Sequence, residues 1–240
     1  MDKGEDVSEE KESFLEWFNE VVPETQFPQI AAQVLFECMN CNECCRGEGY
    51  TLVDHEDMQE IARSFEVSQV EAEARFTDPD PEERIGYRVL KNIGTERNCC
   101  FLDAKTHRCR VYESRPRICR TFPMLNPDPV CGEVICFYPD CLGTARFADM
   151  LRKKRRDPEV QKDILRLQKD AKRLDALKIM QFVWLQKMTG KTEEAEDICR
   201  ITGIKPPSQE NAFKRECLAY FLMTIATDGL EEYKYEGRER

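Results

Sequence analysis

The sequence predicts a mainly α protein, of the α+β kind with little strand. A small irregular cysteine-rich metal-binding core is flanked by helices and followed by a C-terminal helical bundle. Two observations predict this arrangement. Most of the 13 cysteines fall in the middle of the chain. After about residue 146, apolar residues recur every three or four positions, which is the period of amphipathic helices.

The first predicted region is an acidic N-terminal segment, residues 1–37, with two short helices. Ser8 can cap the first helix, which carries Phe18 on its apolar face and ends before Pro23. Pro28 can open the second helix, because proline is favoured in the first turn. This second helix would lead the chain directly to the first cysteine.

The second predicted region, residues 38–145, is the cysteine-cluster metal-binding domain. Two helices are expected between its cysteines: one capped by Asp54 with the sequence DHEDMQEIARSF, the other capped by Ser68 with the sequence SQVEAEARF. β-Branched and aromatic residues predict a strand in IGYRVLKNI. The stretch 121–143 is proline-rich without a clear period, and we expect it to be a loop.

The third predicted region, residues 146–240, is helical. Asp157 and Pro158 supply an N-cap and a proline at the first helical position, and Gly190 marks the far end. The apolar period between these points predicts one long amphipathic helix. Beyond it, a shorter helix is expected between Thr192 and Gly203. A third would open at Ser208.

The composition excludes several classes of function. A formal net charge of −10 argues against nucleic-acid binding, which needs a basic surface. The start MDKGEDVSEEKE resembles neither a secretory signal nor a transit peptide. No apolar run approaches the roughly 20 residues of a bilayer-spanning helix. We therefore expect a cytoplasmic protein without membrane insertion.

A reducing compartment disfavours structural disulfides, so clustered cysteines there indicate metal binding or catalysis. The stretch CMNCNECC at 38–45 overlaps two Cys-x-x-Cys pairs. This spacing wraps three thiolates around one centre, as in bacterial ferredoxins. Structural zinc sites more often take one such pair from each of two segments, so zinc stays an alternative. Cys45 points away from its neighbour Cys44, and it can serve a second metal.

A second cluster reads NCCFLDAKTHRCRVYESRPRICRTFP. Together with CMNCNECC, it resembles the CxxCxxCC cysteine-cluster (YkgJ-like) family, a zinc- or iron-chelating domain related to flagellin lysine N-methylases. The resemblance covers about residues 36–143, and the element RPRICRTFP makes it specific. Asn42 stands where the family usually has glycine. Because asparagine tolerates the left-handed conformation, we expect the turn to survive.

The resemblance implies a set of metal ligands, carried over position by position: Cys38, Cys41, Cys44, Cys45, Cys99, Cys109, Cys119 and Cys141. Cys131 and Cys136 compete with Cys141 for the last place. Cys100 is an extra thiol, either a ligand or a bystander. Eight thiolates could hold two four-cysteine centres, or one centre with spare thiols.

Two arginines flank Cys119. Arg115 and Arg120 could donate hydrogen bonds to sulfur or offset the negative charge of a thiolate centre, or each could pair with a surface acid. The two histidines are expected outside the ligand set. His107 is interpreted as a turn residue and His55 as an exposed residue at a helix start.

The predicted function is a metal-binding protein that carries one or two iron–sulfur clusters, of the 4Fe–4S type. It would act in electron transfer or as an assembly or accessory subunit of a larger complex. Protein partners would bind the helical flanks, namely the acidic residues 1–37 and the basic run at 152–156. Two alternatives stay open: a structural zinc adaptor, and a methylase-like enzyme using S-adenosylmethionine. Against the enzyme, no glycine-rich cofactor turn is present.

Overall fold

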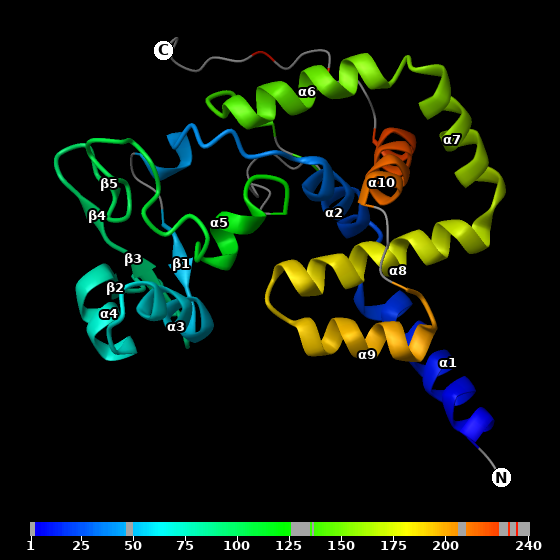
Figure 1. Ribbon diagram of the computed structural model, residues 1–240, viewed down its shortest axis with the longest axis horizontal. Helices are drawn as coiled ribbons and strands as arrows, with labels where there is room; N and C mark the ends of the chain where they lie inside the picture. Colours follow the sequence, from blue (N-terminus) through cyan, green and yellow to red (C-terminus); the bar gives the residue numbers. More distant parts are fainter. Residues whose placement is uncertain are drawn as a thin grey trace. The chain divides into compact units, whose positions relative to one another are not determined.

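The structure is a computed structural model that describes residues 3–46, 50–125, 135, 137–205, 210–225, 230 and 234 (Figure 1). Helices dominate this part of the chain and the strands are only two or three residues long, so the predicted fold class is confirmed. The chain forms two compact units. We call residues 1–37, 123–137 and 144–234 the helical unit, and residues 38–122 and 138–143 the cysteine unit.

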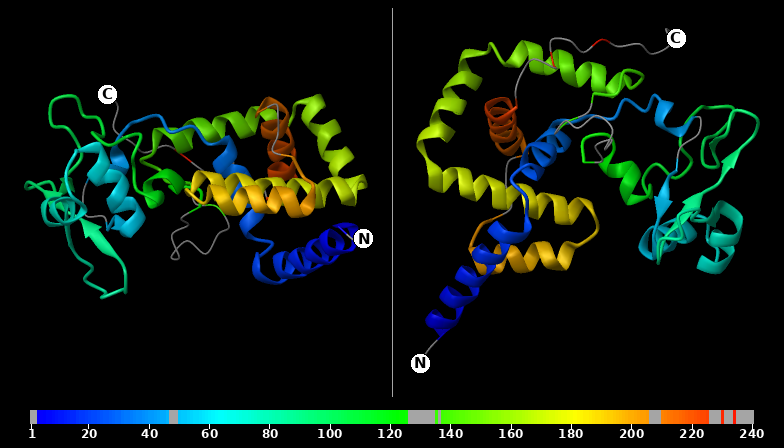
Figure 2. Two further views of the ribbon diagram at one scale, coloured as in Figure 1. Left: turned by 60° about the horizontal axis from the view of Figure 1, so that its bottom comes forward. Right: turned by 180° about the vertical axis from the view of Figure 1, so that it is seen from behind.

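Seven helices supply the described part of the helical unit: α1 Lys3–Val21, α2 Gln26–Leu35, α6 Leu142–Lys154, α7 Pro158–Lys169, α8 Ala171–Met188, α9 Thr192–Thr202 and α10 Glu210–Thr224. The first two residues of α6 belong to the cysteine unit. Helix α10 packs against α2 and α7, while α8 packs against α2 and α9. Figures 1 and 2 show α6, α7 and α8 following one another around α2 and α10.

The core of the helical unit is apolar and continuous. Phe27 and Ile30 of α2, Leu151 of α6, Leu177 of α8 and Phe221 of α10 are almost completely buried. Burying one such side chain contributes roughly 1.5–3 kcal/mol. Packing between helices therefore accounts for the stability of this unit.

The prediction of one long helix from Asp157 to Gly190 is wrong. Helix α7 ends at Lys169, and Asp170 leaves the helical region with φ −124° and ψ 85°. The Asp170 carboxylate accepts a hydrogen bond from the backbone N–H of Arg173 and caps α8. Asp170 thus ends one helix and caps the next, even though the spacing of apolar residues continues through it.

The two N-terminal helices form, but each begins before the residue that was predicted to start it. Helix α1 begins at Lys3, so Ser8 lies inside it instead of capping it. Helix α2 begins at Gln26, which places Pro28 in its first turn. Helix α9 lies between Thr192 and Gly203 as predicted, and Gly203 ends it in the left-handed conformation. The predicted start at Ser208 lies outside the described residues.

The cysteine unit combines short strands with short helices. Strands β1 Leu52–Val53, β2 Thr77–Pro79 and β3 Arg88–Leu90 form an antiparallel sheet in the order β1-β3-β2, and β4 Asn92–Ile93 pairs with β5 Asn98–Cys99. The helices are α3 His55–Ser64, α4 Gln69–Phe76, α5 Arg117–Thr121 and a 3-10 turn, η1 Glu43–Cys45. The strand predicted in IGYRVLKNI is confirmed as β3 and β4.

Both predicted helix caps of the cysteine unit are confirmed. Asp54 accepts from the N–H of Asp57 at 2.9 Å at the start of α3. Ser68 accepts from the N–H of Glu71 at 3.2 Å at the start of α4. These two helices cover a small aromatic core. None of the helices in the described part of the chain has the length and apolar character that a bilayer crossing requires.

Candidate metal centre

The first cysteine loop is shaped by two asparagines with positive φ, Asn40 at 52° and Asn42 at 64°. The expectation that Asn42 preserves the left-handed turn is confirmed. Asn42 is only 5% exposed. Its side-chain amide donates to the carbonyl of Asn40 at 3.1 Å and also to the carbonyl of His107. Asn42 therefore fixes this loop and ties it to the second cysteine loop.

The second cysteine loop is a tight turn between Leu102 and Cys109, which form an isolated antiparallel bridge. The carboxylate of Asp103 accepts from the N–H of Thr106 at 2.7 Å. His107 has φ 53° and lies exposed in this turn, as predicted. His55 begins α3 and is exposed, also as predicted.

The third cysteine segment is α5, which carries Cys119. Helix α3 holds it, because the N–H of Arg117 donates to Asp57 at 2.8 Å and the Arg117 guanidinium contacts Asp54 at 2.8 Å. Burial raises the pKa of the Asp57 carboxyl above its usual range. The same two aspartates that start α3 thus position the segment bearing Cys119.

The thiols of all three segments share one electrostatic neighbourhood. Burial raises the pKa of the Cys119 thiol, and negative charge on nearby thiols raises that pKa further, namely those of Cys44, Cys99 and Cys109. Burial likewise raises the pKa of Cys109, and the charges of Cys99 and Cys44 raise it further. The adjacent thiols of Cys44 and Cys45 are hydrogen-bonded, which lowers the pKa of Cys44 and raises that of Cys45.

A separate pairing involves the first loop and the chain just before α6. The Cys141 thiol hydrogen-bonds to Cys41 and is the main reason why the pKa of Cys41 is lowered to about 5. Cys41 is buried, whereas Cys38 is exposed. The side chain of Cys38 interacts with Tyr112, whose pKa is raised chiefly by burial.

Cys100 differs from the other cysteines in this unit. It is 7% exposed and lies in the apolar cluster. Its thiol donates to the carbonyl of Phe76 at 3.6 Å. The neighbouring Cys100 thiol is also the main cause that lowers the pKa of Cys99 to about 7. This environment favours a bystander role for Cys100, while Cys131 and Cys136 lie outside the described residues.

The two arginines that were expected beside Cys119, Arg115 and Arg120, have different neighbours. The positive charge of Arg115 acts to lower the pKa values of three thiols, those of Cys44, Cys109 and Cys119. Its guanidinium lies 3.7 Å from the centre of the Tyr112 ring and donates to the Tyr112 carbonyl at 2.7 Å. Arg120 instead pairs with Glu60 of α3 at 3.4 Å. The two arginines therefore have different surroundings.

Sequence reasoning missed a further cation, Arg110. Its guanidinium donates to the Cys100 carbonyl at 2.7 Å, and its charge contributes to lowering the pKa of Cys99. The repeated Cys-Arg step offered a signal, since Arg110 follows Cys109 as Arg120 follows Cys119. Only the turn at 102–109, however, brings Arg110 alongside Cys99.

The chemistry of this donor set fits a thiophilic metal. All described cysteines are free thiols, and thiolates are the ligands of structural zinc and of iron–sulfur clusters. Their side chains are arranged as pairs. Among the described residues, no three cysteine, histidine or acidic side chains already form a group that could hold a metal ion.

Comparison with known proteins supports metal binding by this domain. Residues 37–141 match the model of the CxxCxxCC family, described as "Putative zinc- or iron-chelating domain", which confirms the resemblance seen in the sequence. Uncharacterized protein MJ0661 of Methanocaldococcus jannaschii is 32% identical over 93 residues, or 38% of this chain. The chain matches only 45% of that relative's length. No solved structure is detectably similar to the chain.

Proposed function

We propose that the CxxCxxCC domain at residues 37–141 binds one or two iron–sulfur clusters, and that the protein is an electron-transfer or assembly subunit of a larger complex. One observation carries the proposal. The charges of Cys44 and Cys99, which come from two other segments, raise the pKa of the Cys119 thiol in the third segment. The overlapping Cys-x-x-Cys pairs favour iron–sulfur over zinc.

Two sets of thiols would hold the metal. The first comprises Cys99, Cys109, Cys119 and one member of the adjacent pair Cys44 and Cys45. This grouping is supported by the charges of Cys44 and Cys99, which raise the pKa values of both Cys109 and Cys119. The second set would use the remaining thiols of the first loop together with Cys141, supported by the hydrogen bond between Cys41 and Cys141. Cys44 and Cys45 would serve different sets, which requires the contact between their two thiols to open when metal binds.

The chain's own residues have two tasks at such a site. A bound cluster supplies reversible one-electron transfer. Arg115 and Arg110 offset the negative charge of four thiolates, which favours the reduced state. Asn42 holds the two cysteine loops against each other, and Asp57 holds α5, which carries Cys119, against α3. Both contacts limit the movement needed to bind metal.

The exposure of two cysteines supports a role with a partner. Cys38 and Cys44 are exposed, whereas the thiols of Cys41 and Cys100 are buried. A centre that uses either exposed thiol would lie at the protein surface. A partner that docks over this loop would come close enough to exchange electrons.

Zinc is the second candidate, because the family description names zinc beside iron. Metal and acid-labile sulfide analysis of anaerobically purified protein, together with its visible absorption spectrum, separates the two. The proposal expects iron and sulfide in equal amounts and a brown chromophore that dithionite bleaches. Colourless protein with one or two zinc ions per chain would contradict it and leave a structural module.

Matched variants test the ligand assignment. Cys99→Ser should lose metal, whereas Cys100→Ala should keep it, because the Cys100 thiol already donates to a backbone carbonyl within the apolar cluster. If both variants retain full metal content, Cys99 is not a ligand. Cys44→Ser and Cys45→Ser, compared in the same way, would identify which set each thiol serves.

A further inference from the structure

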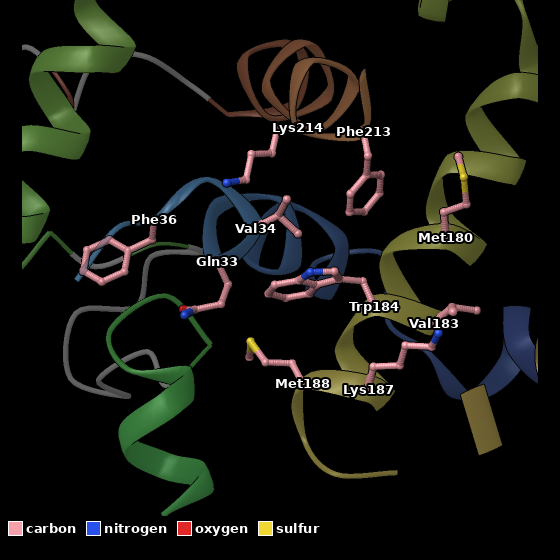
Figure 3. Close-up of a pocket in the computed structure, with 10 residues that line it drawn as sticks. All are labelled: Gln33, Val34, Phe36, Met180, Val183, Trp184, Lys187, Met188, Phe213 and Lys214. Atoms are coloured by element: carbon pink, nitrogen blue, oxygen red, sulfur yellow. The ribbon is translucent and has the colours of Figure 1, made fainter. Parts of the chain in front are cut away.

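A cavity of about 510 Å³ lies between α2, α8 and α10 of the helical unit (Figure 3). Two of its polar lining residues, Gln33 and Lys214, already have interaction partners. Unpaired charges accompany exposed apolar side chains on two outer helix faces instead, one on α1 and one on α7. These two faces carry opposite charges.

The first face, on α1, is acidic and partly apolar. Trp17 is 44% exposed and Val21 is 54% exposed, and they lie one helical turn apart. Beside them run Glu9, Glu16 and Glu20, whose spacing also places them in one row. All three carboxylates are exposed, and none has a partner among the described residues. We call these five residues the acidic face.

The second face, on α7, is basic. The apolar side of α7 packs on α8 and α10, so its opposite side points outward. That outward side carries Lys162, Leu165 and Lys169, which share one row of the helix. Leu165 is 54% exposed, and neither ammonium group has a partner within the described part of the chain. Glu159 lies at the edge of this row and not between the lysines. We call Lys162, Leu165 and Lys169 the basic face.

The two faces match each other in charge and in spacing. Lys162 and Lys169 are seven residues apart, as are Glu9 and Glu16, and seven helical residues rise about 10.5 Å. The exposed leucine between the lysines can then meet the exposed tryptophan beside the glutamates. Two acidic faces would repel each other, and so would two basic faces. The charges therefore favour pairing of one face with the other.

The acidic and basic faces of one chain do not cover each other. Both helices belong to the helical unit, where α1 packs on α9, and α7 packs on α8 and α10. Figures 1 and 2 show α1 and α7 apart from each other within this unit. Pairing of the two faces therefore requires two chains.

We propose that the acidic face of one chain binds the basic face of a second copy. Used in both directions, this contact closes a two-fold symmetric dimer, the commonest kind of oligomer. Exposed ion pairs contribute little each, so apolar contact supplies most of the affinity and the charges select the pairing. Such a small interface implies weak association, with a dissociation constant of roughly 10–100 µM. It does not depend on which metal the cysteine unit binds.

The test is sedimentation velocity of the metal-loaded full-length chain, over concentrations that bracket this dissociation constant. Anaerobic reducing buffer excludes disulfides between chains. We expect reversible conversion of monomer to dimer as the concentration rises. Reversing the acidic face with Glu16→Lys and Glu20→Lys should weaken association roughly tenfold or more. Reversing the basic face with Lys162→Glu and Lys169→Glu should have the same effect.

Mixing the two reversed variants is the decisive measurement. Both contacts between the unlike chains are then complementary again, so the equimolar mixture should dimerise about as tightly as the unmodified protein. Asp175→Lys with Glu194→Lys makes the same net charge change as the α1 variant, at exposed positions outside both faces, and should dimerise normally. Circular dichroism verifies that each variant is folded. Monomer at every concentration, equal association of the α1 variant and this control, or no recovery in the mixture would each overturn the proposal.

Discussion

The two units of this protein are held together by different forces. In the helical unit, helices enclose a continuous apolar core in which Phe27, Leu151 and Phe221 are almost completely buried. The cysteine unit has a much smaller cluster: Val53, Met58, Ile61, Ala62, Ala72, Phe76, Leu90, Cys100, Phe101 and Val111. Small cores rarely suffice alone, and metals or disulfides commonly supply the difference.

Polar contacts supplement the small core of the cysteine unit. Asp57 joins α3 to α5, and Asn42 joins the two cysteine loops. Asp80 contacts Arg84 at 2.7 Å and accepts from its N–H, which closes the loop after β2. Each such hydrogen bond contributes only about 1 kcal/mol net. From this difference we expect packing to fold the helical unit and, under the proposed function, thiolate–metal bonds to complete the cysteine unit.

Removing the metal should produce the largest effect and separate the two units. Structural thiolate sites contribute on the order of 10–16 kcal/mol in small zinc peptides, and this binding energy acts as folding energy. Chelation under reducing conditions should therefore unfold the cysteine unit while α8 and α10 remain folded. Hydrogen exchange measured by mass spectrometry should show protection lost across residues 50–122 and kept across 171–188.

Variants provide the same comparison without a chelator. Cys41→Ser should lose metal and destabilise residues 38–143, since its thiol pairs with Cys141. Cys199→Ser, in the helical unit, should keep metal and stability. Simultaneous loss of protection in both units after chelation would show that the metal stabilises the whole chain, contrary to this comparison.

A core truncation in the helical unit is the converse experiment. Phe221 is 1% exposed, and its ring centre lies 5.7 Å from that of Phe147. Phe221→Ala should cost about 3–5 kcal/mol of unfolding free energy. Urea unfolding followed by far-UV circular dichroism measures it, and the metal content should not change. Val70→Ala, at a position 77% exposed on α4, is the control and should have little effect.

Local features of the fold were predictable because short-range chemistry determines them. Asp54 and Ser68 cap helices by bonding backbone groups within three residues, and Asn42 adopts a conformation that few residue types tolerate. The break at Asp170 was missed because the apolar period continues through it. The signal was an N-capping residue type inside an otherwise helical stretch.

The candidate site was predictable in residue type and less so in arrangement. The cysteine motifs predicted the resemblance that the match over residues 37–141 confirms, while the choice of thiol ligands stays a prediction. The proximity of Arg110 to Cys99, and the burial of Cys100 in the apolar cluster, depend on the turn at 102–109 and on strand pairing. These contacts join residues with no fixed spacing, so no periodic pattern reveals them.

An intermediate loss of stability is expected when the buried carboxylate of Asp57, which joins α3 to α5, is removed. Asp57→Ala leaves the N–H of Arg117 without its acceptor, which should cost about 1–3 kcal/mol and loosen α5. Because Cys119 lies in α5, metal should also pass to a competing chelator faster. Glu56→Ala changes the exposed neighbouring carboxylate and should behave like the unmodified protein. Equal release rates in the two variants would exclude a role for Asp57 in positioning Cys119.

The smallest effects should come from Asn42, where two contributions can be separated. Asn42→Ala keeps a β-carbon at φ 64° without the polar side chain that makes this conformation tolerable, which costs up to about 1–2 kcal/mol, and it also removes the hydrogen bond to His107. Asn42→Gly removes the same hydrogen bond but adopts this φ without strain. The glycine variant should therefore unfold at a urea concentration between those of the unmodified protein and the alanine variant. If the two variants unfold together, the hydrogen bond between the cysteine loops outweighs backbone strain. Asn42 would then act mainly as a tie between those loops, a contact that glycine at this position does not make.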